Sequence, residues 1–394
     1  MNIRQIIKKI VVIIYHIFLK VLPVDNNVIF FESSVGRNYS SNPKYVYQEM
    51  VKQQLDKEFK CIWSLEDITI EIPGNVIKVK RARLKYLYYL AIAKIWVCDT
   101  RQPVFLVKRT DTTYIQLWHG TPLKKLAMDM DVLKMSDGME LSVYKRLFKK
   151  NTETWDYLIS QSDYTTEKFR SSFDFKKIIL KTGFPRNDIL FKKNNKKSID
   201  SIKNRYNIPT DKKIILYAPT WRDDEFYENG IYKFSSKMDF SLLKKELSDT
   251  YIILVKLHYL VEDSVDWSNY QGFIYKFDRL WDIQELYLIS DVLLTDYSSV
   301  IFDYAILNRP MIIYAYDYEN YRNNLRGFYF NIFEKFPGPI VENTPDLVDS
   351  IKNYKFEDYE GKYTEFLEKF TSYDDGNASS RIVDLILEKT NDKK

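Results

Sequence analysis

Residues 115–125 read Ile-Gln-Leu-Trp-His-Gly-Thr-Pro-Leu-Lys-Lys, and this stretch predicts how the chain folds. An apolar run leads into His119 and then into Gly-Thr-Pro, which is typical of a buried strand that ends in a turn. We expect a helix to begin at or near Pro122. The strand would then present an imidazole at its carboxyl end, which is where open α/β sheets bind their ligands.

A second histidine occupies a similar position. Residues 252–258 read Ile-Ile-Leu-Val-Lys-Leu-His, so His258 also follows an apolar strand, while the third histidine, His16, lies in an apolar N-terminal stretch. The alternative is that each strand-end histidine only caps its strand. Because His119 and His258 fall in different halves of the chain, we expect them to face one shared cleft.

The composition is that of a large globular protein. The chain has 394 residues, of which 45% are hydrophobic and 29% charged, which is enough for two or three domains. Its two cysteines lie in apolar stretches without zinc-site spacing, which argues against a disulfide scaffold and suits a reducing compartment. A net charge of +5 is too small to indicate a nucleic-acid partner but is compatible with phosphate-rich ligands.

Apolar strands alternate with helical stretches along the chain, a pattern that predicts parallel sheets built from βαβ units. A polar run at 192–198 interrupts the pattern, and a fresh α/β series begins at 214. We therefore expect two Rossmann-like domains that face each other across a cleft. The expected divisions are an amphipathic membrane-associating helix over 1–24, an acceptor-side domain over 25–192, a linker over 193–204, a nucleotide-donor domain over 205–375 and a closing helix over 376–394.

The N-terminal stretch 1–22 contains four basic residues and no acidic one. Ile3, Ile10, Ile14 and Ile17 lie on one face of a helix, together with further apolar residues. Its uncharged core is too short to span a bilayer, and no signal-peptide cleavage site follows. This pattern favours in-plane binding to an anionic membrane surface, with an ordinary packed helix as the alternative.

The stretch 291–303 carries the second strong motif. An apolar strand ends at Asp296, and a helix is expected to begin at Ser298 or Ser299. Hydroxyls and free N–H groups at such a helix start can bind a diphosphate, although serine is also a common N-cap. Neither a Gly-x-Gly-x-x-Gly motif nor a Walker motif is present, which disfavours nicotinamide and P-loop chemistry.

Four ordered motifs, at 118–124, 219–222, 256–258 and 295–303, resemble those of the CDP-glycerol glycerophosphotransferases, the teichoic acid primases and polymerases of Gram-positive bacteria. The resemblance runs from about residue 28 to 390 and implies a GT-B fold and a cytidine-diphosphate-activated polyol donor. It also implies a peripheral enzyme at the cytoplasmic face of the cell membrane. Tyr259 departs from the pattern, since many members carry proline there.

The resemblance also implies which residues bind the donor. Catalysis is assigned to His119 as general base and His258 as donor to the phosphates, with the reverse assignment left open. We expect neither a metal nor a cofactor, because cationic and helix-terminal groups can supply the compensating charge. The expected donor-binding residues are Gly120, Thr121, Pro122, Leu123, Arg186, Thr220, Trp221, Arg222, Lys256, Leu257, Ser298, Ser299 and Asp303.

The expected reaction moves glycerol phosphate or ribitol phosphate from a CDP-activated donor to a lipid-linked or polymer acceptor. This would serve teichoic acid or capsule synthesis and release CMP. One alternative is a sugar-nucleotide glycosyltransferase of the same GT-B fold, because a fold does not fix the chemistry. A non-catalytic membrane protein that binds polyanions is the other.

Overall fold

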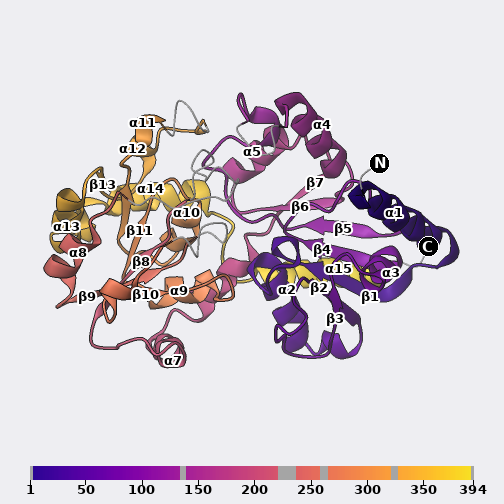
Figure 1. The fold of residues 1–394 in the computed structure, drawn as a ribbon, viewed down its shortest axis with the longest axis horizontal. Coiled ribbons are helices and arrows are strands. Elements are labelled where there is room, and N and C mark those ends of the chain that lie inside the picture. Colours follow the sequence, from indigo (N-terminus) through magenta and orange to yellow (C-terminus); the bar gives the residue numbers. More distant parts are fainter. Residues whose placement is uncertain (1–2, 134–138, 221–236, 258–264, 321–326, 392–394) are drawn as a thin grey trace.

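The computed structural model describes residues 3–133, 139–220, 237–257, 265–320 and 327–391. Its first half forms one sheet in the order β3-β2-β1-β4-β5-β6-β7, in which every pair is parallel (Figure 1). The inner strands β2, β1, β4, β5 and β6 form from apolar runs that are largely buried, as expected of a parallel sheet, while the edge strands β3 and β7 are more exposed. Their bounds are β1 (Asp25–Glu32), β2 (Lys60–Leu65), β3 (Val76–Lys80), β4 (Ala93–Cys98), β5 (Thr113–Gln116), β6 (Tyr157–Ser160) and β7 (Ile178–Lys181).

Helices cover both faces of this first sheet. One hydrophobic core includes Phe30 and Trp96, and the other includes Ile29 and Phe31, so neighbouring strand residues point to opposite faces. The helices of this half are α1 (Ile3–Val21), α2 (Ser41–Lys52), α3 (Leu84–Ile92), α4 (Leu141–Thr152), α5 (Asp163–Ser172) and α6 (Asp188–Lys192).

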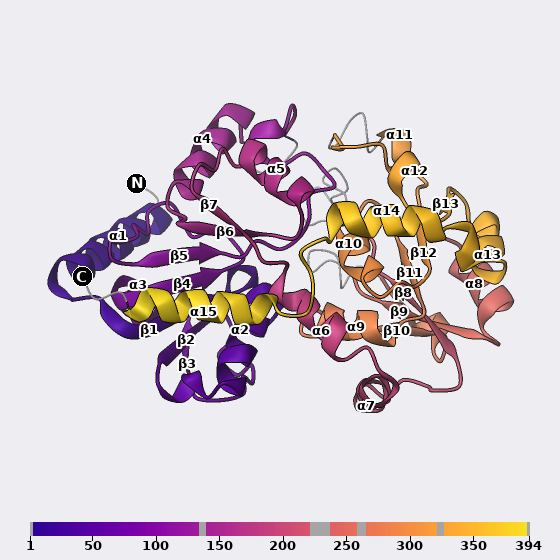
Figure 2. The same cartoon turned by 180° about the vertical axis from the view of Figure 1, so that it is seen from behind.

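The second half repeats the architecture with a parallel sheet in the order β10-β9-β8-β11-β12-β13 (Figure 2). Its strands are β8 (Lys213–Tyr217), β9 (Tyr251–Val255), β10 (Ile274–Lys276), β11 (Val292–Thr295), β12 (Met311–Tyr314) and β13 (Ile340–Val341). Its helices are α7 (Lys196–Arg205), α8 (Phe240–Leu247), α9 (Ile283–Ile289), α10 (Val300–Ala305), α11 (Tyr318–Asn320), α12 (Ile332–Lys335), α13 (Thr344–Lys352) and α14 (Glu360–Phe370).

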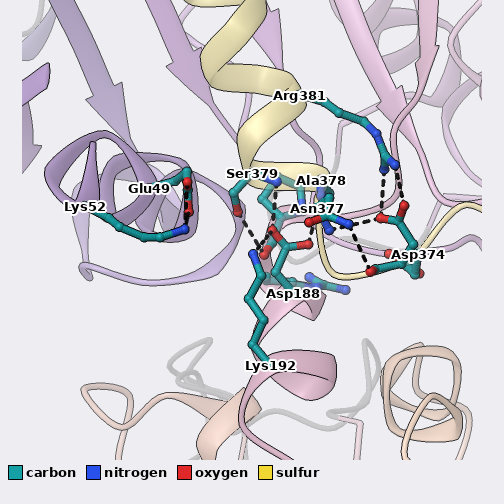
Figure 3. A network of polar contacts seen from close by, with 12 residues as sticks. Glu49, Lys52, Asp188, Lys192, Asp374, Asn377, Ala378, Ser379 and Arg381 are labelled. Atoms are coloured by element: carbon teal, nitrogen blue, oxygen red, sulfur yellow. Dashed lines mark hydrogen bonds and ion pairs between the residues drawn. The ribbon is translucent and has the colours of Figure 1, made fainter. Parts of the chain in front are cut away.

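The last helix, α15 (Ala378–Asn391), crosses back and packs on the first sheet (Figure 2). Its Ile382 and Ile386 lie in the same core as Ile29. The Asp188 carboxylate anchors the helix start, because it accepts hydrogen bonds from the main-chain N–H groups of Ala378 and Ser379 at 3.0 and 2.8 Å (Figure 3). Helix α15, which follows the second sheet in sequence, therefore completes the core of the first half.

One sequence-based expectation stays a prediction, and another differs from the structure. The range 193–204, expected as a linker between the halves, contains most of the helix α7, whose Ile202 is buried in a hydrophobic core of the second half with Ile199 packed beside it. The helix expected near Pro122 is absent from the described stretch 117–126. That stretch instead pairs with the second half: the N–H of Lys125 donates to the carbonyl of Gly327 at 2.8 Å.

The N-terminal helix α1 has two apolar faces, not the single one expected. The inner face packs along α3, with Tyr15 fully buried and Ile14 and Phe18 beside it. The outer face leaves Ile13 and Ile17 exposed. Figures 1 and 2 place α1 at the end of the molecule farthest from the second sheet.

Candidate active site

A pocket of about 500 Å³ lies between the two halves. Its lining includes Asp99 and His119, which follow β4 and β5 of the first sheet, and Lys256 and Ser298, which follow β9 and β11 of the second. Because strands of parallel sheets end at a common edge, the two sheets bring their carboxyl ends to this one pocket.

His119 presents its imidazole to this pocket in a fixed orientation. The ring stacks on Trp118, with centroids 4.5 Å apart, and Nδ1 lies 2.9 Å from the main-chain oxygen of Asp99. A carbonyl can only accept, so Nδ1 carries the proton and Nε2 is left as the basic nitrogen.

The charge state of His119 follows from its surroundings. His119 as a whole residue is exposed, whereas its imidazole is desolvated by the protein atoms around it. That burial lowers its pKa to about 4; the hydrogen bond to Asp99 opposes the shift, and the charges of Arg186 and Arg101 add to it. The downward direction keeps the imidazole neutral at physiological pH, which is the form that a general base requires.

Arg186 joins the two halves behind the histidine. Its guanidinium donates to the carbonyl of His119 at 2.6 Å and forms an ion pair with Asp303 of α10 at 2.6 Å. Both side chains are buried, and burial raises the pKa of Asp303 although Arg186 favours its ionised form. Gly120 fits against the same junction, since a Cβ there would lie 3.0 Å from Ser299 Oγ and 3.5 Å from the Arg186 guanidinium.

Asp99 is a second titratable group in the pocket. It is 1% exposed, and its carboxylate accepts a hydrogen bond from the Ser34 N–H at 2.9 Å. Burial raises the pKa of Asp99 to about 7, while the Ser34 bond and the charge of Arg186 lower it. The carboxyl group therefore titrates near neutrality beside His119.

The structure brings some of the expected site residues together in the pocket and places others behind it. The hydroxyl of Thr121 donates to Gln161 at 2.5 Å, and Leu123 packs in a hydrophobic core of the second half. These two residues therefore support the structure behind the pocket. Of the expected residues, those that line the pocket are His119, Arg186, Lys256, Leu257 and Ser298. The remaining described ones, which are not among the lining residues, are Gly120, Pro122, Thr220, Ser299 and Asp303.

Three expected residues, Trp221, Arg222 and His258, lie outside the described residues, so the shared histidine cleft stays a prediction. The ammonium of Lys256 donates to the main-chain oxygens of Asp278 and of Trp281, the latter at 3.0 Å. This fixes its side chain at the rim formed by 278–281. In the described part of the chain, no group of three or more His, Cys, Asp or Glu residues is arranged to hold a metal ion.

The sequence analysis missed several pocket residues. Asp99 was detectable in principle, because it directly follows the apolar strand 93–98. Asn38, Asp282 and Gln284 gave no such signal, since only the approach of the two halves brings them to one pocket.

The fold and the pocket define a transferase of the GT-B type, with two parallel α/β units around one cleft. The chain belongs to the CDP-glycerol:poly(glycerophosphate) glycerophosphotransferase family, whose model matches residues 13–388. It is 43% identical over 98% of both chains to a teichoic acid poly(glycerol phosphate) polymerase of Bacillus spizizenii. It is also 43% identical to the Bacillus subtilis protein of that name, of whose length it spans 49%.

Solved structures of the wall teichoic acid polymerase TagF share the fold. One has a TM-score of 0.90 at 42% identity and covers 98% of this chain and 96% of that chain. A histidine-to-asparagine variant of TagF, soaked with CDPG, matches with a TM-score of 0.89 at 44% identity and covers 95% of this chain and 92% of that chain. The protein is thus a glycerophosphotransferase that moves a polyol phosphate in teichoic acid synthesis.

Proposed function

We propose that the enzyme transfers glycerol phosphate from CDP-glycerol to the end of a lipid-linked teichoic acid chain and releases CMP. The observation that carries this proposal is the neutral, oriented imidazole of His119 in a pocket shared by both halves. Family membership supports the choice of donor, since the family is described by CDP-glycerol.

In the proposed reaction, Nε2 of His119 takes the proton of the acceptor hydroxyl as its oxygen attacks the donor phosphorus. The bond from this phosphorus to the CMP oxygen breaks, and CMP leaves with growing negative charge. Ser298 and the N–H groups that follow it lie at the pocket and can stabilise that charge. His258 would assist from the phosphate side, which the sequence resemblance suggests.

A donor screen tests the proposal. The full-length enzyme is incubated with CDP-glycerol, CDP-ribitol or a sugar nucleotide and a lipid-linked acceptor, and the released nucleotide is identified. We expect CMP from CDP-glycerol. Release of UDP or CDP from a sugar nucleotide would instead favour the glycosyltransferase alternative. CMP release from CDP-ribitol alone would make the enzyme a ribitol phosphate transferase.

We also propose that α1 attaches the enzyme to the cytoplasmic face of the membrane, where a lipid-linked acceptor resides. The α1–α3 apolar face consists of Ile10, Ile13, Ile17 and Val21 of α1 with Leu84 and Tyr88 of α3. Phe18 joins the two helices, with its ring 6.2 Å from that of Tyr88. The exposed Lys9, Lys20 and Lys85 add positive charge suited to anionic lipids.

None of the helices in the described ranges is long and apolar enough to cross a membrane. If the α1–α3 apolar face binds in the plane of the membrane, charged substitutions in that face should weaken the binding. Ile13→Asp combined with Ile17→Asp should weaken binding to anionic vesicles at least ~10-fold, since each half-exposed side chain contributes roughly 1 kcal/mol. Vesicle sedimentation measures this, and turnover of a short water-soluble acceptor should be unchanged.

The control is Ile68→Asp, which places the same change at an exposed isoleucine outside that face. These point variants are sharper than deleting residues 1–22, because deletion would also remove the buried Tyr15 from the first core. Equal sedimentation of the double variant and the control would mean that α1 is only a packing element.

A further inference from the structure

Two side-chain amides line the pocket, one from each half, and each has a buried polar atom without a hydrogen-bond partner among the described residues. Gln284 of α9 is 1% exposed, and its side-chain nitrogen Nε2 is buried without a hydrogen-bond partner among the described residues. Asn38, in the loop after β1, has a buried Oδ1 in the same condition. Both residues line the pocket that contains His119.

Asn38 is positioned through its side chain and Gln284 through its main chain. Asn38 donates from Nδ2 to the carbonyl of Arg279 at 2.9 Å, which leaves Oδ1 as its remaining group. The main-chain N–H of Gln284 donates to Asp282 at 3.1 Å. Asp282 is in turn paired with Lys44 at 2.5 Å and accepts from the Tyr45 hydroxyl at 2.7 Å, so α9 is fastened to α2 of the first half.

A buried amide without a partner carries a free-energy cost, and such groups are rare in folded proteins. A bound ligand that completes the hydrogen bonds removes this cost. One group here is a neutral donor and the other a neutral acceptor. Together they suit a hydroxyl, which both donates and accepts, better than a phosphate, which carries negative charge and accepts only.

We propose that Gln284 and Asn38 form a polyol subsite that hydrogen-bonds the hydroxyl groups of a glycerol unit. The inference rests on the proposed function, because it supplies the substrate class that brings such hydroxyls. The glycerol unit belongs either to the CDP-glycerol donor or to the end of the acceptor chain. Because Gln284 lines the pocket that contains His119, it would be a specificity-determining residue, since a site built to pair with a hydroxyl rejects ligands that lack it.

The test uses Gln284→Met, which keeps the length of the side chain and removes the amide. Affinities of the full-length variant for CDP-glycerol and CMP are measured by calorimetry, and KM is measured for the acceptor. If the hydroxyls are the donor's, CDP-glycerol binding weakens about 10-fold and CMP binding stays within 2-fold of wild type. If they are the acceptor's, the acceptor KM rises about 10-fold and CDP-glycerol affinity is unchanged.

Either result supports the subsite and identifies its occupant. Unchanged affinities and KM overturn it, as does an equal loss of CMP and CDP-glycerol binding, which indicates a damaged pocket. The melting temperature of the free variant should not fall, because the removed donor has no partner there. Should Gln284→Met fail to fold, Gln284→Leu removes the same donor without adding a charge, and the same outcomes apply.

A matched control is Gln53→Leu, which removes an exposed glutamine outside the pocket and should leave all these values unchanged. Measurements on the wild-type enzyme distinguish a failure of the proposed function from a failure of the polyol subsite. A wild-type protein that neither binds nor turns over CDP-glycerol contradicts the proposed function itself. A wild-type protein that is active on CDP-glycerol, with a variant that matches it, contradicts only the polyol subsite.

Discussion

Replacing His119 with alanine should lower kcat at least about 100-fold, the size typical of a lost general base. The melting temperature should change little, because His119 as a whole residue is exposed. Steady-state release of CMP from CDP-glycerol measures the effect. The matched control is His16→Ala, which removes an exposed imidazole from α1 and should leave kcat unchanged. A His119→Ala enzyme within 3-fold of wild type would contradict the assignment.

The same histidine predicts the acid side of the pH profile. Protonation of Nε2 abolishes the base, so kcat/KM should fall as pH falls through the pKa of His119 in the free enzyme. Because burial lowers this pKa toward about 4, the fall should lie below the ordinary histidine range near 6.5. Asp99 ionises near pH 7 in the same pocket, so the profile is compared with that of Asp99→Asn. If the pH at which kcat/KM falls is shifted in Asp99→Asn, that fall reports the Asp99 carboxyl group and not His119.

The second large effect is expected at the ion pair between Arg186 and Asp303. Asp303→Ala leaves a guanidinium that is 7% exposed without its charge partner, which should cost roughly 3–5 kcal/mol of stability. Activity should fall as well, because the freed Arg186 also holds the carbonyl of His119. Urea denaturation followed by circular dichroism measures the loss of stability.

The control for this variant is Glu246→Ala, which breaks a partly exposed ion pair with Lys352 of similar length, 2.6 Å. Solvent screens that pair, so its loss should shift the urea midpoint much less than Asp303→Ala does. If Asp303→Ala and Glu246→Ala had similar urea midpoints, the buried ion pair would contribute no more to stability than the exposed one, and the prediction would be wrong.

The regular parts of the fold were predictable because parallel strands are continuous apolar runs. The strand expected before His258 is β9, and the strand expected before His119 is β5. The helix expected at Ser298 or Ser299 is α10, which begins at Val300 with Ser299 as its N-cap. These elements depend on local pattern and on burial alone.

The features that the sequence did not reveal depend on contacts between residues far apart in the chain. The segment after Pro122 is not helical, because its backbone bonds to Gly327 of the other half. The polar run before Ile199 gave no sign that a helix there packs on the second core. The role proposed for Gln284 depends on an amide left without a partner, which only a three-dimensional arrangement can reveal.

The position of α15 has a consequence for how the protein is made. Strands β1 to β7 are synthesised well before α15, whose Ile382, Val383 and Ile386 cover Ile29 and Phe31. Until α15 has left the ribosome, the nascent first half must therefore carry an uncovered apolar face, which is a binding surface for chaperones and for other unfinished chains. A premature stop before Ala378 would make that exposure permanent while leaving every pocket residue described above in the chain.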